Sequence, residues 1–349
     1  MIYVDGSQKS GSGTIVRYAV GLAALLGEEL RLTNIRAKRD KPGLRPQHLK
    51  AIEAVAELCG GKLEGGRVGS QEVLFTPGRA IKAGRFEWDI GTAGSATMHA
   101  LTILPAACFA PGPVVCRIVG GLFQDFAPSA YYMQHVLLPM LHKIGVHARL
   151  EVVRPGYVPR GGGIIELEVC PVKDRLVHLE LPEQGRVTRI EGVALSSHLK
   201  ERKVSERMAT ECQRVLRSAG LSASIASVYD DSALQAGAAL ALFAYTHSGC
   251  IVGSDQAGAP RRTSEAIAKY VARSLTEDLA SGATVDRFLA DQLIFWTALA
   301  HGTSRYRIPC LTEHVETNLW LVESILGAKT RIYDDMVIEV EGVGYVRNA

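Results

Sequence analysis

Paired cysteines, long apolar runs and a strong net charge are all missing from this sequence, and each absence narrows the class of protein. The seven cysteines are odd in number and scattered, and none forms a Cys-x-x-Cys pair. This pattern is typical of reduced thiols and argues against disulfides or a cysteine zinc site. No apolar run reaches the ~18 residues that a membrane-spanning helix requires. We therefore expect no membrane association.

The chain also lacks the basic stretch of a secretory signal peptide, because its first residues, MIYVDGSQ, are typical of a strand that enters a turn. We therefore expect a cytoplasmic protein. The formal net charge of +3 is too small to identify a nucleic-acid partner. The histidines lack the H-x-x-x-H and H-E-x-x-H spacings, so no zinc site is predicted and any metal ligands stay unidentified.

The composition that is present is typical of a soluble globular enzyme. Apolar residues make up 47% of the chain and charged residues 21%. With 349 residues, the chain is longer than most single-core proteins, so we expect two domains or a repeated architecture with an insert. The 35 glycines cluster in loops, which indicates many tight turns or loops that cradle anions.

Three stretches share one order of elements, namely helix, strand, helix, glycine and strand. They begin at residues 14–27 (TIVRYAVGLAALLG), 91–109 (GTAGSATMHALTILPAACF) and 285–302 (VDRFLADQLIFWTALAHG). The residues between the second and third stretches have a strand and helix pattern of their own. We predict a layered α/β (α+β) fold, in which residues 1–180 and 282–349 form a large domain of three repeated units and residues 181–281 form a smaller inserted α/β domain.

Two segments have the composition of phosphate-binding loops. The loop DGSQKSGSG, residues 5–13, precedes a helix, and its backbone N–H groups suit an anion, although an ordinary turn explains it about as well. Residues 36–50, RAKRDKPGLRPQHLK, carry six cations against the single acid Asp40. Guanidinium groups pair with phosphate oxygens, and two prolines stiffen the segment, so we favour phosphate binding over a merely solvated loop.

His314 begins a helical pattern in the stretch TEHVETN, with Thr312 in the N-cap position. The positive end of a helix dipole disfavours an imidazolium, so the ring is expected to be neutral and nucleophilic near pH 7. Such a ring can form a covalent nucleotidyl intermediate, although a histidine at a helix start is more often a surface residue. Asp291 and Gln292 interrupt an apolar helix, where they either hold a ligand or face solvent.

In order and context, these motifs resemble RNA 3'-terminal phosphate cyclases over nearly the whole chain. The matching stretches are DGSQ, IRAKRDKPGLRPQHL, IGTAGSATMHALTILPA, VVCRIVGG, VLLPMLHKIG, GYVPRGGG, FLADQL and EHVETNLWLVE. The resemblance implies a ligase-class enzyme of RNA processing that uses ATP. In the implied reaction, His314 attacks the α-phosphate to give histidyl-AMP, AMP passes to the RNA 3'-phosphate, and the 2'-hydroxyl then closes a 2',3'-cyclic phosphate.

The resemblance also implies which residues bind the nucleotide and the RNA end. Residues that match the phosphate-binding positions are Arg17, Arg36, Arg39 and Gln47, and those that match the nucleotide pocket are Pro128, Phe288, Leu289, Ala290, Asp291 and Gln292. An aromatic ring at position 288 can stack on a base. A divalent ion, Mg²⁺ or Mn²⁺, would neutralise the triphosphate. The implied partners are ATP and RNA 3' ends, and the oligomeric state is not indicated.

Several positions depart from the pattern of the family. Members usually have GEGGGQ where this chain has KSGSGT, so Ser10 replaces a carboxylate that is associated with the metal and the triphosphate. Lys9 adds a positive charge beside it, and Leu101 and Phe288 replace a common glutamine and a common tyrosine. An alternative is therefore a catalytically weakened relative that binds RNA as a processing or assembly factor. A third reading, an enolpyruvyl transferase with a similar repeat, is disfavoured by RAKRDKPGLRPQHL and EHVETN.

Overall fold

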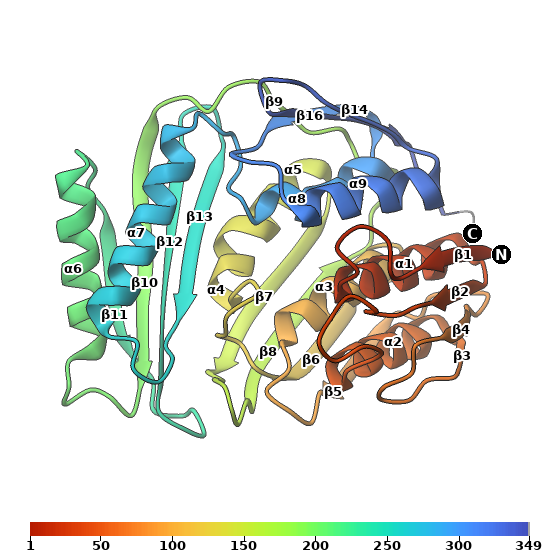
Figure 1. Ribbon diagram of the computed structural model, residues 1–349, viewed down its shortest axis with the longest axis horizontal. Coiled ribbons are helices and arrows are strands. Elements are labelled where there is room, and N and C mark those ends of the chain that lie inside the picture. The colour runs from red at the N-terminus through yellow and green to blue at the C-terminus, as the bar shows by residue number, and fades with distance from the viewer. Residues whose placement is uncertain (348–349) are drawn as a thin grey trace.

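The computed structural model describes residues 1–347, and these form four four-stranded sheets with helices packed on them (Figure 1). Parallel and antiparallel pairs occur within each sheet. The predicted layered α/β fold is confirmed. Among these residues, no helix is both long and apolar enough to cross a membrane.

The first repeated unit has the strand order β1-β2-β4-β3. Its elements are β1 (Ile2–Asp5), α1 (Gly13–Leu26), β2 (Leu30–Thr33), α2 (Pro46–Cys59), β3 (Lys62–Glu64) and β4 (Val73–Thr76). Strands β1 and β2 are parallel, whereas β4 runs antiparallel to both β2 and β3. Helix α1 is thus a crossover between parallel strands, which a hairpin cannot connect.

The second and third units repeat this topology, with the strand orders β5-β6-β8-β7 and β9-β14-β16-β15. The second unit contains β5 (Gly84–Asp89), α3 (Ala96–Cys108), β6 (Val114–Gly120), α4 (Ala130–Tyr132), the π-helix η1 (Met133–Leu137), α5 (Leu138–Ile144), β7 (His147–Arg154) and β8 (Gly163–Cys170). The third contains β9 (Glu180–Leu181), α8 (Leu289–Leu299), β14 (His301–Arg307), α9 (Glu313–Leu326), β15 (Lys329–Ile332) and β16 (Val337–Val343).

The predicted order of helix, strand, helix and strand therefore recurs, with an opening strand and a second closing strand added to each unit. Two predicted helices differ in detail. The stretch 129–145 contains the π-helix η1, which ends at Leu137, two residues before Pro139, whose missing N–H interrupts the regular ladder. The stretch 285–302 becomes helical only at Leu289, because the Asp286 side chain accepts hydrogen bonds from the N–H groups of Phe288 and Leu289.

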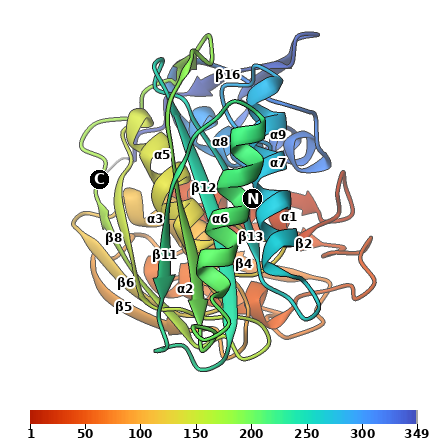
Figure 2. The same ribbon diagram turned by 90° about the vertical axis from the view of Figure 1, so that its left-hand side faces the viewer.

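A fourth sheet, of order β11-β10-β12-β13, lies between β9 and α8 in the sequence. It is formed with helices by β10 (Val187–Ser197), α6 (Val204–Ser218), β11 (Ser224–Tyr229), β12 (Gly237–Thr246), β13 (Ile251–Ala257) and α7 (Ser264–Ala280). Helices α6 and α7 cover its outer face, where they share a separate apolar core (Figure 2). Its inner face contributes Leu195, Phe243 and Ala257 to the main core. The domain limits at residues 181 and 281 stay a prediction.

The helices of the three units pack against one another in the interior, while their sheets lie outside (Figure 1). Helix α1 contacts α2, α3 and α9. Each of α1 and α9 begins at a capped N-terminus, at Ser12 and Thr312 respectively. The side chains of Thr14 and His314, in the first turns of the two helices, approach to 3.4 Å, so the two N-termini meet.

Candidate active site

A cavity of about 520 Å³ opens beside these two helix N-termini. It is lined by Thr14, Arg17, Tyr18, Met98, Leu101, Gln124, Asp125, Phe126, Ala127, Pro128, Tyr132, Asp255, Gln256, Arg262, Tyr270, Phe288, Asp291, Gln292 and His314. These residues come from all three repeated units and from the fourth sheet with its helix α7. Most small-molecule sites have this mixture of apolar walls and a few convergent polar groups.

His314 reaches the cavity from the first turn of α9. The Thr312 hydroxyl caps this helix by accepting a hydrogen bond of 3.2 Å from the N–H of Val315, as the sequence predicted. On the opposite side, the Thr14 hydroxyl lies 3.4 Å from Nδ1 of His314. His314 remains partly open to solvent, and contacts from two helices orient its imidazole.

The pKa of His314 lies below its ordinary value. Burial is the largest cause, the positive charges of Arg17 and Arg39 lower it further, and Glu313 opposes them. A neutral ring near pH 7 follows, which is the protonation state that a nucleophile needs. Arg17 and Arg39, which the family resemblance assigns to phosphate binding, therefore lie close enough to the ring to lower its pKa.

Arg17 and Asp291 form the polar floor beside the nucleophile. The Nη2 atom of Arg17 donates a hydrogen bond of 3.1 Å to the Thr14 hydroxyl. Burial lowers the pKa of Arg17 to about 10, so the group remains charged near pH 7. Burial also raises the pKa of Asp291 to about 7, although Arg17 and an amide hydrogen bond of 3.3 Å from Asn318 favour the carboxylate. Asp291 and Gln292 thus face the cavity and not solvent.

The other predicted site residues divide into two groups. Pro128 and Phe288 line the cavity, whereas Arg39 does not. Leu101, which departs from the family pattern, also lines it. Arg36 and Gln47 do not line it: Arg36 donates to the carbonyls of Lys41 and Gly43 and so shapes the basic segment, while Gln47 accepts a hydrogen bond from the Ser95 N–H. The adjacent residues 289 and 290 are fully buried and are likewise absent from the lining.

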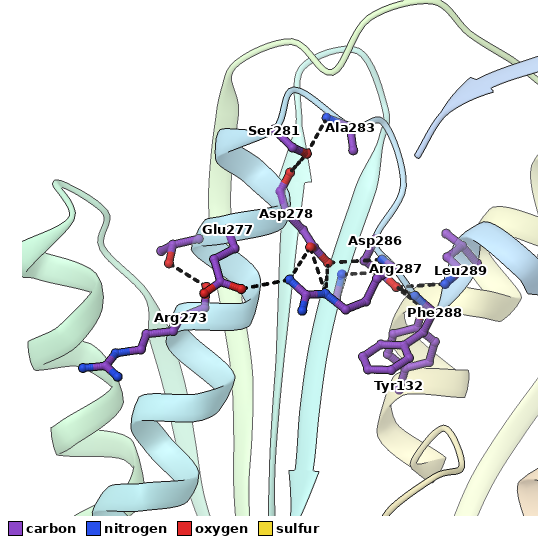
Figure 3. Close-up of polar contacts among 12 residues, drawn as sticks. Tyr132, Arg273, Glu277, Asp278, Ser281, Ala283, Asp286, Arg287, Phe288 and Leu289 are labelled. Atoms are coloured by element: carbon purple, nitrogen blue, oxygen red, sulfur yellow. Dashed lines mark hydrogen bonds and ion pairs between the residues drawn. The ribbon is translucent and has the colours of Figure 1, made fainter. Parts of the chain in front are cut away.

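Asp286 fixes the position of Phe288 and joins three parts of the molecule (Figure 3). Its carboxylate accepts hydrogen bonds from the Tyr132 hydroxyl (2.7 Å), the Gly253 N–H (2.8 Å) and the N–H groups of Phe288 and Leu289 (2.9 Å each). These partners belong to α4, to β13 and to the start of α8. Because the carboxylate is buried, its pKa is raised to about 6.

Comparison with known proteins identifies the family of this chain. Residues 8–332 match the family model described as RNA 3'-terminal phosphate cyclase. The proteins named RNA 3'-terminal phosphate cyclase from Hyperthermus butylicus and Pyrobaculum aerophilum are 39% and 36% identical to it, over 99% of each chain. The protein of that name from Korarchaeum cryptofilum is 38% identical over 98% of each chain. The chain belongs to the RNA 3'-terminal phosphate cyclase family. The resemblance read from the sequence, and with it the prediction of an enzyme, is confirmed.

In this cyclase-family chain, the fourth sheet and its helix supply one wall of the cavity, which the sequence did not predict. Asp255 and Gln256 lie on β13, and Arg262 and Tyr270 on or just before α7. Arg262 donates to both oxygens of Asp125, at 2.9 and 2.8 Å, and so connects this wall to the loop 121–129. No sequence motif marks these residues, because their partners lie more than a hundred positions away.

The neighbourhood of Ser10 does not fit a divalent ion held by side chains. Ser10 is buried, and its hydroxyl donates to Ser12 (3.0 Å) and accepts from Thr317 (2.9 Å). Among residues 1–347, no group of three histidine, cysteine or acidic side chains is placed to bind a metal. Mg²⁺ prefers carboxylate, phosphate and water oxygens. An ion at this site would therefore depend on nucleotide phosphates and water for its ligands.

Proposed function

We propose that this chain converts the 3'-terminal phosphate of RNA into a 2',3'-cyclic phosphate at the expense of ATP. The observation that carries the proposal is the position of His314 at the N-terminus of α9, where it lines a cavity together with Arg17. Burial and the charges of Arg17 and Arg39 lower the pKa of this ring. The relatives bear the name of this activity. The cytoplasmic location that the sequence predicts belongs to the same proposal.

The first step forms a covalent bond between the histidine and the nucleotide. A ring nitrogen of His314 attacks the α-phosphorus of ATP, a P–N bond forms, the bond to the bridging oxygen breaks, and pyrophosphate leaves. The charge of Arg17 is placed to stabilise the negative charge that develops on the phosphate oxygens. The apolar residues Phe288, Pro128 and Leu101 suit the flat faces of an adenine.

The two following steps activate and close the RNA end. The RNA 3'-phosphate displaces the histidine and takes up AMP, which gives the terminal phosphate a good leaving group. The neighbouring 2'-hydroxyl then attacks that phosphorus and releases AMP. The basic segment supplies exposed cations for the RNA backbone, including Lys38 and Arg39. Phosphate contacts of this kind do not depend on the RNA sequence.

The test is to incubate the protein with ATP labelled at the α-phosphorus and a divalent ion, and to follow label that stays on the chain. We expect label that is labile in acid and stable in alkali, as a phosphoramidate is. His314→Ala should abolish it. His247→Ala, which changes an exposed histidine in the turn between β12 and β13, is the matched control and should label normally.

A second candidate function is supported by the loss of the carboxylate at position 10. A chain that binds RNA without reacting with ATP would retain the basic segment and the fold. Absence of label with ATP, GTP and either Mg²⁺ or Mn²⁺, together with RNA binding that His314→Ala leaves unchanged, would favour this binding factor over the enzyme.

A further inference from the structure

The Thr14 hydroxyl stands between the nucleophile and a permanent cation. Its oxygen accepts a hydrogen bond of 3.1 Å from Nη2 of Arg17 and lies 3.4 Å from Nδ1 of His314. Thr14 is buried, and it occupies the first turn of α1, where the N-cap Ser12 accepts a hydrogen bond from its N–H. The position of the hydroxyl is therefore set by the helix start and not by a flexible loop.

The donors and acceptors around this oxygen allow two arrangements, and each requires a different tautomer of His314. A guanidinium has no acceptor, so Arg17 must donate to the hydroxyl oxygen. If the hydroxyl proton pointed at Nδ1, the ring would carry its own proton on Nε2, and the remaining lone pair would be blocked by Thr14. If Nδ1–H donates to the second lone pair of the hydroxyl oxygen, Nε2 is unprotonated and free. The hydroxyl proton can then be donated to another acceptor, and Thr14 itself lines the cavity.

We propose that Thr14 is a positioning residue for the nucleophile: it holds His314 as the Nδ1–H tautomer and leaves the lone pair of Nε2 exposed to the α-phosphorus. The inference rests on the proposed function, because it names the nitrogen that performs the first step. During attack the proton stays on Nδ1, the Nε2–P bond forms, and the positive charge on the ring is balanced by the phosphate oxygens. The charged groups that act on this ring are Arg17, Arg39 and Glu313.

The tautomer can be observed directly, without any reaction. Protein labelled with ¹⁵N at histidine is recorded in long-range ¹H–¹⁵N spectra at about pH 8, where the ring is neutral, and the signal of His314 is assigned from its loss in His314→Ala. We expect a protonated Nδ1 and an unprotonated Nε2 in the unaltered protein. Thr14→Val removes the hydroxyl at nearly constant shape and should shift the ring toward the Nε2–H tautomer, which free histidine favours.

Rates of histidyl-AMP formation test whether the Thr14 hydroxyl orients His314 for attack. At saturating ATP, Thr14→Val should form the adduct about tenfold to a hundredfold more slowly, the scale expected when a reacting group loses its orientation. The dissociation constant for ATP should change much less than this rate. Thr14→Ser keeps the hydroxyl and should restore most of the rate. Thr317→Val is the matched control, because it removes a buried hydroxyl of α9 that bonds to Ser10 and not to His314.

Two results would overturn the inference. One is an Nε2–H tautomer of His314 in the unaltered protein, which needs no variant and therefore does not depend on how Thr14→Val folds. The other is a Thr14→Val protein with the tautomer and the rate of the unaltered chain. If no adduct forms with any nucleotide, the proposed function fails, while the spectrum still decides whether Thr14 fixes the tautomer.

Discussion

The arginines at the two ends of the cavity differ in whether they form ion pairs. At the end formed by α1 and α9, Arg17 lines the cavity. Neither Arg17 nor Arg36 and Arg39 of the basic segment belongs to an ion pair within the described residues. At the end formed by the fourth sheet, Arg262 is paired with Asp125. Arg287, which does not line the cavity, is paired with Asp278 and Glu277 where α7 leads back to the third unit.

This difference distinguishes arginines that are available to bind an anionic ligand from arginines that stabilise the fold through ion pairs. Burial lowers the pKa of Arg17 although the nearby charge of Asp291 raises it, and an anionic ligand would offset the cost of that burial. The paired arginines gain their partner on folding. We therefore propose that the first end recognises phosphate and that the second end attaches the fourth sheet.

The largest effect is expected from removing the Asp286 carboxylate, whose hydrogen bonds join the fourth sheet to two of the repeated units. Asp286→Ala leaves four donors without their acceptor, namely the hydroxyl of Tyr132 and three backbone N–H groups, and all but the N–H of Phe288 are buried. We expect the free energy of unfolding to fall by about 3–5 kcal/mol, measured by urea denaturation. Asp334→Ala, at an exposed position, is the control and should change it by less than about 0.5 kcal/mol. An equally small loss at position 286 would show that these hydrogen bonds do not hold the fold.

The first end of the cavity could largely be predicted from the sequence, whereas the second could not. The N-cap at Thr312, the glycine-rich loop and the basic segment are contiguous patterns whose physical meaning is local. The pair of Asp125 with Arg262 is a meeting of residues 137 positions apart, so no periodicity reveals it. The sequence also does not predict the opening strand β9, because its two residues, Glu180–Leu181, carry no periodic pattern.

A second prediction concerns the missing carboxylate at the first end. In the double variant Ser10→Glu with Lys9→Gly, a glutamate adds an oxygen ligand that Mg²⁺ prefers, and a nearby positive charge is lost. We expect the apparent affinity for Mg²⁺ during histidyl-AMP formation to rise about tenfold. The matched control, Ser10→Gln with Lys9→Gly, has the same shape without the charge. Equal metal dependence in both double variants would mean that position 10 does not approach the ion.

The pH dependence of histidyl-AMP formation tests whether the charge of Arg39 acts on His314. Only the neutral ring attacks, so the rate should rise as the pH passes the pKa of His314, which burial, Arg17 and Arg39 hold below 6.5. In Arg39→Gln a positive charge that disfavours protonation is lost, so the pKa should rise and the acid limb of the rate profile should move to higher pH. Lys41→Gln, in the same basic segment, should leave the limb in place. A limb that does not move in Arg39→Gln would separate this arginine from the nucleophile.

The smallest effect is expected at the ion pair of the second end. The side chains of Arg262 and Asp125 are 25% and 37% exposed, so water screens their attraction. A double-mutant cycle with Arg262→Gln and Asp125→Asn should give a coupling of about 0.2–1 kcal/mol in the free energy of unfolding. The dissociation constant for ATP should change by less than about fivefold, because this pair holds the wall and does not neutralise the phosphates. If either variant weakened ATP binding a hundredfold, the pair would act on the nucleotide directly, and the two ends of the cavity would no longer differ in kind.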